Sequence, residues 1–412
     1  MNDVNENQEH VAIIGQGYVG LELAMAAANT NLNVYGVDTA PKRIAEIASG
    51  SSPVENVTDQ VLQSLLSKGT YHPTQDFSEI AKCGVVVICV PTPITTNGEP
   101  DLSFLYSAID FIAIHLQPGT LVINESTSYP GTLRNLIKPG IEKSRPDLID
   151  SIKYAVAPER VNPGSGISVS KVTRIVSGID EASSNAARDF YAKLCDSVLI
   201  VESPEIAEMA KLLENSFRQV NISFVNEFNL ICRHLGIDTR SVIRAAATKP
   251  YGFMEFSPSS GIGGHCIPVD PLYLQYAART SSKSSSLIEA AYKVNNNHAK
   301  ELCNLIFNHL GKKPKRFLLL GVAYKSGLSD TRESPSEKLV NYLISEGVQV
   351  GWIDPLVDQF MNQKEANPDE LWECALVVTA QENLPISQCL AKGIMVFDST
   401  GHFSDLSAVV QI

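Results

Sequence analysis

HVAIIGQGYVG, residues 10–20, is the stretch that decides the fold. A short apolar run leads into the glycine pattern G-x-G-x-x-G, and an alanine-rich segment at 21–29 that favours a helix follows it. A second apolar run at 33–37 then ends at Asp38. Strand, glycine turn, helix, strand and acid in this order predict a Rossmann-type unit that binds a dinucleotide.

Each part of this pattern has a physical task. Gly15 makes the tight turn, Gly17 lets a pyrophosphate approach the backbone, and Gly20 lets the helix pack against the strand. The helix N-terminus offers unpaired amides to the phosphates. Asp38 suits two ribose hydroxyls and repels a 2′-phosphate, so the sequence favours NAD over NADP. The cofactor-binding candidates are Gly15, Gly17, Tyr18, Val19, Gly20, Asp38 and Arg43, the last placed over the adenine or, alternatively, an ordinary surface arginine.

Three further apolar runs deliver polar residues where a strand is expected to end. The runs at 83–90, 120–124 and 153–157 lead into Pro-Thr-Pro, Glu-Ser-Thr and Pro-Glu-Arg. Ligands of parallel sheets bind at the carboxyl ends of the strands, so we expect a shared cleft here rather than three unrelated polar loops. The candidates from these ends are Thr92, Thr127, Glu159, Arg160 and Val161.

A long helix is predicted from Ser203-Pro204 to the residue before Gly236. Serine before a helix and proline at its first position are start signals, and glycine is a stop signal. A helix of about thirty residues exceeds the usual length, so it is expected to link two domains. Its site candidates are Lys211, Asn215 and Arg218, which share one face; a solvated face is the alternative interpretation.

GIGGHCIPVD, residues 261–270, places one cysteine in a glycine-built loop. Its glycines permit positive φ angles and close approach of a ligand. The thiol of Cys266, with Asp270 four residues on, suits covalent catalysis, because sulfur can add to a carbonyl carbon and later leave it. Taken alone, the loop fits a glycine-rich turn around a buried structural cysteine better than a catalytic site.

The C-terminal part repeats the strand–helix–strand plan of the N-terminus without its glycine fingerprint, at 316–320 and 349–353. We therefore predict an α/β protein with two Rossmann-like doubly wound domains, joined by a long central helix and a helical dimerisation region. The expected boundaries are 1–202 for the NAD-binding domain, 203–310 for the central helical region with the cysteine loop, and 311–412 for the C-terminal domain. Broad apolar helical faces in the central region predict a homodimer.

Composition excludes several classes of protein. A chain of 412 residues is expected to form two or three domains. Its net charge of −12 argues against nucleic-acid binding. No apolar run approaches the roughly 20 residues that span a bilayer, so we expect no membrane partner. Eight irregularly spaced cysteines indicate a reducing compartment, hence a cytoplasmic protein, and eight histidines without ligand spacing predict no metal site.

The motifs together resemble the UDP-sugar 6-dehydrogenase family, also called the UDP-glucose/GDP-mannose dehydrogenase family, over essentially the whole chain. Its members oxidise the 6-hydroxymethyl group of a nucleotide sugar to a carboxylate with two NAD⁺. Glu22 stands where the family commonly has proline, and we expect no functional change from it. The shared motifs are G-x-G-Y-V-G at 15–20, V-P-T-P at 90–93, E-S-T at 125–127, P-E-R at 158–160, K-L-L-E-N-S-F-R at 211–218, G-G-H-C-I-P-V-D at 263–270, and G-V-A-Y-K with D-T-R-E-S-P within 321–335.

The resemblance implies a role for each candidate. Cys266 attacks the aldehyde formed by the first oxidation, Lys211 and Asn215 stabilise the resulting oxyanion, and Glu159 activates water for thioester hydrolysis. The first-step base is either Lys211 or a water molecule held by Thr127 and Asp270. The implied catalytic set is Cys266, Lys211, Asn215, Glu159, Asp270 and Thr127; the substrate set is Arg160, Val161, Lys211, Asn215, Arg218, Gly263, His265 and Lys325; Thr92, Thr127 and Arg332 are assigned to the cofactor, with the diphosphate as the alternative for Arg332.

The resemblance also bears on the sugar. G-G-H-C-I-P-V-D resembles the branch that acts on UDP-N-acetylhexosamines rather than on UDP-glucose. Within it, E-S-T-S-Y-P-G-T at 125–132 and T-K-P-Y-G-F at 248–253 look more like UDP-N-acetylglucosamine enzymes. The alternatives are UDP-N-acetylmannosamine, then UDP-glucose. A catalytically silent protein that binds NAD or a nucleotide sugar is the alternative outside enzymes.

Overall fold

The computed structural model describes residues 10–160, 169–363, 365–367 and 369–412. The chain forms two compact units. The first comprises Met1–Leu213 with Leu272–Ser281, and the second comprises Glu214–Pro271 with Ser282–Ile412. Two helices, α7 (Pro204–His234) and α9 (Asp270–Thr280), contain residues of both units.

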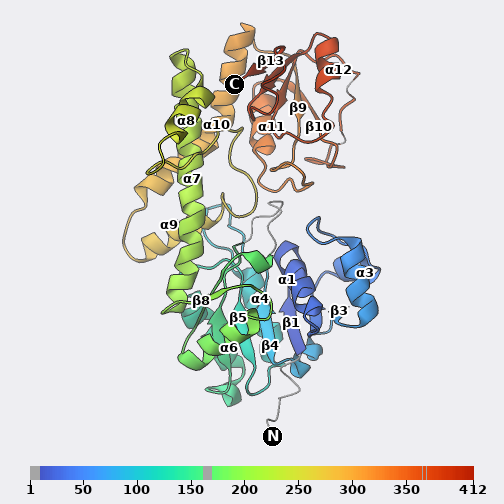
Figure 1. The fold of residues 1–412 in the computed structure, drawn as a ribbon, viewed down its shortest axis with the longest axis vertical. Helices are drawn as coiled ribbons and strands as arrows, with labels where there is room; N and C mark the ends of the chain where they lie inside the picture. Colours follow the sequence, from blue (N-terminus) through green and yellow to red (C-terminus); the bar gives the residue numbers. More distant parts are fainter. Residues whose placement is uncertain (1–9, 161–168, 364, 368) are drawn as a thin grey trace. The chain divides into compact units, whose positions relative to one another are not determined.

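Within the described residues of the first unit, one eight-stranded sheet runs in the order β3-β2-β1-β4-β5-β6-β7-β8 (Figure 1). All neighbouring strands are parallel except β6 and β7, which are antiparallel. The strands are β1 (His10–Ile14), β2 (Asn33–Val37), β3 (Tyr71–Thr74), β4 (Val85–Ile88), β5 (Leu121–Asn124), β6 (Lys153–Val156), β7 (Arg174–Gly178) and β8 (Val198–Ile200).

The central strands of this sheet are buried on both faces, as their continuous apolar sequences predict. Two apolar clusters, one containing Val11 and Ile13 and the other Ala12 and Ile14, lie on opposite faces because successive side chains of a strand alternate. The helices of this unit are α1 (Tyr18–Asn29), α2 (Pro41–Ala48), α3 (Asp59–Lys68), α4 (Ser103–Ala113), α5 (Lys138–Ser144) and α6 (Glu181–Tyr191), with short helical turns at Phe77–Lys82, Leu133–Ile137, Pro146–Leu148 and Val169–Lys171.

The second unit has a five-stranded parallel sheet among its described residues, in the order β10-β9-β11-β12-β13. This order corresponds to β2-β1-β4-β5-β6 of the first sheet, so the sheet is Rossmann-like. Its strands are β9 (Arg316–Leu320), β10 (Gln349–Ile353), β11 (Cys374–Val377), β12 (Met395–Asp398) and β13 (Val409–Gln411), and its helices are α8 (Thr239–Ala247), α10 (Ser286–Leu310), α11 (Pro335–Ser345) and α12 (Ile386–Ala391).

In each sheet, one aspartate accepts hydrogen bonds from the backbone of the turn that follows the first strand. Asp38 follows β2 and accepts a hydrogen bond from the amide of Gln16 at 2.8 Å. Asp354 follows β10 and accepts from the amides of Val322 and Ala323 at 2.8 and 3.0 Å. The second unit thus keeps the turn but has a different loop, as its missing glycine fingerprint predicts.

The α/β class and both Rossmann-like sheets are confirmed. In the described part of the chain, no helix combines the length and apolar character needed to cross a bilayer. Two strands, β3 and β13, were not predicted from the sequence. Nor does the sequence indicate that β7 pairs antiparallel with β6.

Candidate functional site

The glycine loop has the shape that a pyrophosphate requires. Gly15 has φ +93°, and a Cβ there would lie 2.7 Å from the carbonyl oxygen of Cys89. A Cβ on Gly20 would lie 1.8 Å from the carbonyl oxygen of Gly15. Gly17, by contrast, has φ −85° and open space around its Cα, directly before the first turn of α1 at Tyr18 and Val19. The loop therefore leaves room at the helix N-terminus, where an anion is stabilised.

Asp38 lies where the ribose of a dinucleotide is bound in this fold. It is buried, and its carboxylate accepts hydrogen bonds from the amide of Ala40 and from Arg43, at 2.9 and 3.1 Å. The hydroxyl of Tyr18 donates to Glu55 at 2.8 Å. Open space at Gly17 and a buried acid after β2 fit NAD.

The ends of β4 and β5 lie side by side, as their sequences predict. The hydroxyl of Ser126, after β5, donates to the carbonyl of Val90, after β4, at 2.9 Å. Thr127 follows and is half-buried. The carbonyl of Thr92 accepts a hydrogen bond from the buried Tyr273 hydroxyl at 3.1 Å, which ties the loop after β4 to α9.

Glu208 of α7 anchors the loop that carries Thr127. Its buried carboxylate accepts from the amides of Gly131 and Leu133, at 2.6 and 3.1 Å, and from the hydroxyl of Ser128 at 3.4 Å. Burial raises the pKa of Glu208 to about 7, although these hydrogen bonds lower it. The sequence motif indicates Lys211 as a site residue. It does not reveal the buried Glu208, which lies one turn earlier on α7.

This pKa predicts a pH-dependent stability. Because the pKa lies above its ordinary value of 4.5, the folded protein binds more protons than the unfolded chain between pH 4.5 and about 7. The free energy of unfolding contributed by Glu208 is therefore lost as pH rises through about 7. We expect Glu208→Gln to reduce the loss of stability between pH 5 and 8 by up to about 3 kcal/mol, measured by urea unfolding at each pH.

Glu205→Gln is the matched control for that experiment. Glu205 lies one turn away on α7, but its pKa is lowered by a hydrogen bond from Arg134. This substitution should leave the loss of stability above pH 5 unchanged. Parallel pH profiles for wild type and Glu208→Gln would show that Glu208 is not the titrating group.

Glu159 follows β6 and lies among charged side chains of the first unit. Its Oε2 accepts from Arg174 at 2.6 Å, and its Oε1 accepts from the amide of Arg160 at 2.6 Å. Arg160 itself donates to the carbonyl of Thr173 at 2.9 Å. Lys211, buried on α7, lies near Glu125 in the same unit, since its charge lowers the pKa of that acid. Val161 lies outside the described residues.

The cysteine loop lies in the second unit. Cys266 is half-buried, and its Sγ lies 3.1 Å from Nδ1 of His265. The amide of Asp270 donates to the carbonyl of Cys266 at 2.8 Å, where α9 begins. The side-chain amide of Asn215 donates to the Asp270 carboxylate at 2.5 Å. Thiol, imidazole, carboxylate and amide are thus brought together, and an imidazole at this distance can exchange a proton with the thiol.

Two glycines let this loop pack against the segment before α11. A Cβ on Gly263 would lie 2.8 Å from Pro335, and one on Gly264 would lie 2.8 Å from the ring of Tyr324. The amide of Gly264 also donates to the carbonyl of Arg332 at 3.2 Å. Gly263 is therefore required by packing, whatever its contact with substrate.

Charged groups near the loop have defined partners. The guanidinium of Arg332 forms an ion pair with Asp330 at 2.6 Å. Burial raises the pKa of Asp330, but hydrogen bonds from Arg332 and the charge of His265 bring it below its ordinary value. The pKa of Lys325 is lowered by burial and by the charge of Arg218. Two cations near each other can stabilise a diphosphate.

The predicted site residues therefore form two groups. The first unit holds Gly15, Gly17, Tyr18, Val19, Gly20, Asp38, Arg43, Thr92, Thr127, Glu159, Arg160 and Lys211, and the second holds Asn215, Arg218, Gly263, His265, Cys266, Asp270, Lys325 and Arg332. Arg174, Glu125, Glu208 and Tyr273 were missed by the sequence interpretation. Glu125 stands in the quoted E-S-T motif, so its position was visible, but its buried ion pair was not.

Comparison with known proteins decides the family. Three models of the UDP-glucose/GDP-mannose dehydrogenase family match in order: the NAD binding domain at residues 9–195, the central domain at 205–297 and the UDP binding domain at 318–393. The chain belongs to this family. It is an NAD-dependent UDP-sugar dehydrogenase, with the glycine loop in the NAD binding domain and the cysteine loop in the central domain.

Individual relatives agree over most of their length. A protein of Methanococcus vannielii named UDP-N-acetyl-D-mannosamine dehydrogenase is 31% identical, covering 92% of this chain and 88% of its own. A Pseudomonas aeruginosa protein named UDP-N-acetyl-D-glucosamine 6-dehydrogenase is 32% identical, covering 84% and 83%. The solved structure of a UDP-D-ManNAc dehydrogenase from Pyrococcus horikoshii has a TM-score of 0.83 and 30% identity, covering 95% of both chains.

Proposed function

We propose that this dehydrogenase oxidises C6 of UDP-N-acetylglucosamine by four electrons, giving UDP-N-acetylglucosaminuronate and consuming two NAD⁺. The observation that carries the proposal is the cysteine loop. Cys266 is half-buried beside His265. Asp270, at the start of the helix that follows the loop, accepts a hydrogen bond from Asn215 of α7. A thiol held in this way can bind an aldehyde covalently between two oxidations, so that no aldehyde is released.

The first oxidation removes the proton of the C6 hydroxyl and one hydride. NAD⁺ bound at the glycine loop supplies the hydride acceptor in both oxidations. Lys211 is one candidate base, and a water molecule held by Thr127 and Asp270 is the other. Asp270 accepts a hydrogen bond from Asn215, which orients its carboxylate to hold such a water molecule.

The thiolate of Cys266 then adds to the aldehyde carbon and forms a thiohemiacetal. Lys211 and the amide of Asn215 stabilise the oxyanion in this proposal. Loss of a second hydride gives a thioester. Glu159 takes a proton from water, the water oxygen adds to the carbonyl carbon, and the carbon–sulfur bond breaks to give the acid and the free cysteine.

The nucleotide end of the substrate is assigned to the C-terminal domain at 311–412, with Lys325 as a contact. In the second unit, the charge of Arg218 lies near Lys325. In the same proposal, Arg160, Val161, Arg218, Gly263 and His265 bind the sugar, while Arg332 binds the cofactor or the diphosphate. Arg43 and Thr92 complete the cofactor set.

UDP-N-acetylmannosamine is the second candidate substrate, because the Methanococcus vannielii and Pyrococcus horikoshii relatives carry that name. The purified enzyme should be assayed for NADH formation with NAD⁺ and UDP-N-acetylglucosamine, UDP-N-acetylmannosamine or UDP-glucose. We expect the highest kcat/KM with UDP-N-acetylglucosamine. A higher kcat/KM with another sugar nucleotide would identify that compound as the substrate instead. No NADH with any of the three would indicate a catalytically silent binding protein.

The partner we propose is a second copy of the chain. In the second unit, α7 exposes apolar side chains at heptad spacing: Phe217, Phe224 and Ile231 are 45%, 63% and 52% exposed. Leu235 follows at the next turn, 67% exposed. Residues seven apart lie on one face of a helix, so these side chains form a stripe that a second α7 can cover.

Phe224→Glu should separate the dimer into monomers. An aromatic side chain central to a symmetric interface occurs twice, so replacing it with a charge should raise the dimer dissociation constant by about a thousandfold. Sedimentation equilibrium at micromolar protein measures this. Ser107→Glu, an equal charge change on the exposed side of α4, is the control. A Phe224→Glu protein that remains dimeric would contradict the stripe as the interface.

A further inference from the structure

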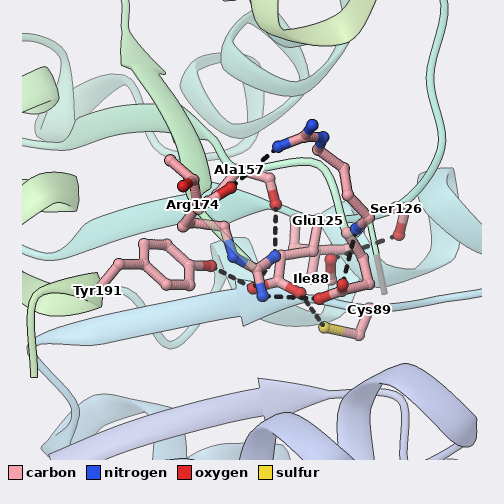
Figure 2. Close-up of polar contacts among 10 residues, drawn as sticks. Ile88, Cys89, Glu125, Ser126, Ala157, Arg174 and Tyr191 are labelled. Atoms are coloured by element: carbon pink, nitrogen blue, oxygen red, sulfur yellow. Dashed lines mark hydrogen bonds and ion pairs between the residues drawn. The ribbon is translucent and has the colours of Figure 1, made fainter. Parts of the chain in front are cut away.

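Arg174 is a buried cation that lies between two carboxylates at the ligand-binding edge of the first sheet. Its side chain is 4% exposed. One guanidinium nitrogen lies 2.6 Å from Oε2 of Glu159, and the other lies 3.5 Å from Oε1 of Glu125, whose side chain is fully buried. Figure 2 shows the guanidinium beside Glu125, with Tyr191 donating its hydroxyl to the same acid.

The reversed strand explains how Arg174 reaches this edge. β7 runs antiparallel to β6, with Val156 paired to Ser177. Extending that register by three residues brings Glu159 opposite Arg174. The first residue of β7 therefore lies at the edge where the parallel strands end. The Arg160 side chain donates to the carbonyl of Thr173, the residue that lies opposite it in the same extended register.

The carboxylate plane of Glu159 is fixed by two donors. Oε2 accepts from Arg174, and Oε1 accepts from the amide of Arg160, both at 2.6 Å. Arg174 is itself fixed by the carbonyl of Ala157 at 3.3 Å and by the ring of Tyr191, 4.9 Å below its guanidinium carbon. A water-activating carboxylate held on both oxygens has one orientation, which is what proton abstraction at a defined site requires.

Charge in this cluster is unbalanced, since one guanidinium faces two carboxylates. Burial raises the pKa of Glu125 to about 7; Arg174 and Lys211 oppose this and Glu159 adds to it. Glu22 of α1, the thiols of Cys89 and Cys195 and the hydroxyl of Tyr191 also face the cluster. Glu125 thus changes its charge near neutral pH while the arginine stays cationic.

We propose that Arg174 is a positioning residue that orients Glu159 for thioester hydrolysis, and that Glu125 draws part of the arginine's charge away from Glu159. The inference rests on the proposed function, in which Glu159 activates the hydrolytic water. Arg174 contributes no proton and no electron pair to that step. With Glu125 ionised, less positive charge rests on Glu159, and its carboxylate is the stronger base.

Arg174→Gln should slow only the last step of the reaction. On mixing with NAD⁺ and UDP-N-acetylglucosamine, we expect a burst of about two NADH per site followed by turnover about a hundredfold slower than wild type. Intact-protein mass spectrometry should show the sugar-nucleotide acyl group on Cys266. Glu159→Gln is the reference and should accumulate the same adduct. Arg174→Lys, which keeps the charge but loses the fork geometry, should recover part of the turnover.

The outcomes separate this inference from the proposed function. Adduct in Glu159→Gln but none in a folded Arg174→Gln, with burst and turnover reduced equally, would overturn the inference alone. No adduct in Glu159→Gln would overturn the hydrolytic role of Glu159, and the inference with it. Acid formed normally by Cys266→Ser would overturn the covalent mechanism itself.

Glu125→Gln tests the charge sharing and keeps the ion pair between Arg174 and Glu159, in case Arg174→Gln does not fold. Adduct decay, followed by rapid quench and mass spectrometry, should quicken in wild type by roughly threefold between pH 6 and 8 as Glu125 ionises. Glu125→Gln should match wild type at pH 6 and show no rise by pH 8. A variant that keeps the wild-type rise would overturn the role of Glu125.

Discussion

Cys266→Ser is expected to abolish acid formation, with a fall in turnover of about a thousandfold or more. A serine hydroxyl at this position is a far weaker nucleophile than a thiol, because much less of it is ionised near neutral pH. The thioester cannot form, so the second oxidation has no covalent intermediate. Acid formation is measured by chromatography of the sugar nucleotides after incubation with NAD⁺.

Cys232→Ser is the control for that substitution. Cys232 is a buried cysteine of α7 in the same unit, and it has no proposed role. Its variant should retain turnover if it folds, as judged by circular dichroism. Wild-type acid formation by Cys266→Ser would refute covalent catalysis, whereas loss in both variants would indicate damage common to cysteine replacement.

Gly17→Ala should weaken NAD binding at least about tenfold without changing the melting temperature. Gly17 has φ −85°, and a Cβ built on it would meet no atom within 4 Å beyond its own chain neighbours. The unliganded protein therefore accepts alanine without strain, while the added methyl group occupies space assigned to the pyrophosphate. Isothermal titration calorimetry and thermal unfolding measure the two quantities.

Gly20→Ala gives the contrasting result. Its Cβ would lie 1.8 Å from the carbonyl oxygen of Gly15, so this variant should lose stability as well as NAD affinity. Unchanged NAD affinity in Gly17→Ala would place the pyrophosphate elsewhere. A lowered melting temperature in Gly17→Ala would show that the open space at this position is needed by the protein itself.

Much of the fold could be predicted because short stretches of the sequence carry the pattern of individual strands. β1, β2, β9 and β10 have the predicted bounds, since each is a short apolar run that ends at a glycine or an acid. β3 was missed because Tyr71-His-Pro-Thr lies at the edge of the sheet and contains a proline, which gives it no buried-strand pattern. β13 is three residues long and carries too little pattern to recognise.

Whether a strand pairs parallel or antiparallel with its neighbour cannot be predicted from its own residues. For this reason Arg174 was missed as a residue of the site. Only the antiparallel pairing of β7 with β6 places Arg174 beside Glu159. Cys266, Asn215 and Asp270 were recognised from their motifs, and two hydrogen bonds now join Asn215 to Asp270 and Asp270 to Cys266. His265 was assigned to the substrate from its motif. Its Nδ1 lies 3.1 Å from the Cys266 sulfur, so it can also exchange a proton with the thiol.

The most direct test of the account is the ratio of NADH to acid in one reaction. Wild-type enzyme is incubated with excess NAD⁺ and a limiting amount of UDP-N-acetylglucosamine, with an aldehyde-trapping hydrazine present. Four-electron oxidation on Cys266 predicts two NADH for each uronate formed and no trapped aldehyde. One NADH for each sugar consumed, with the aldehyde recovered as its hydrazone, would contradict it.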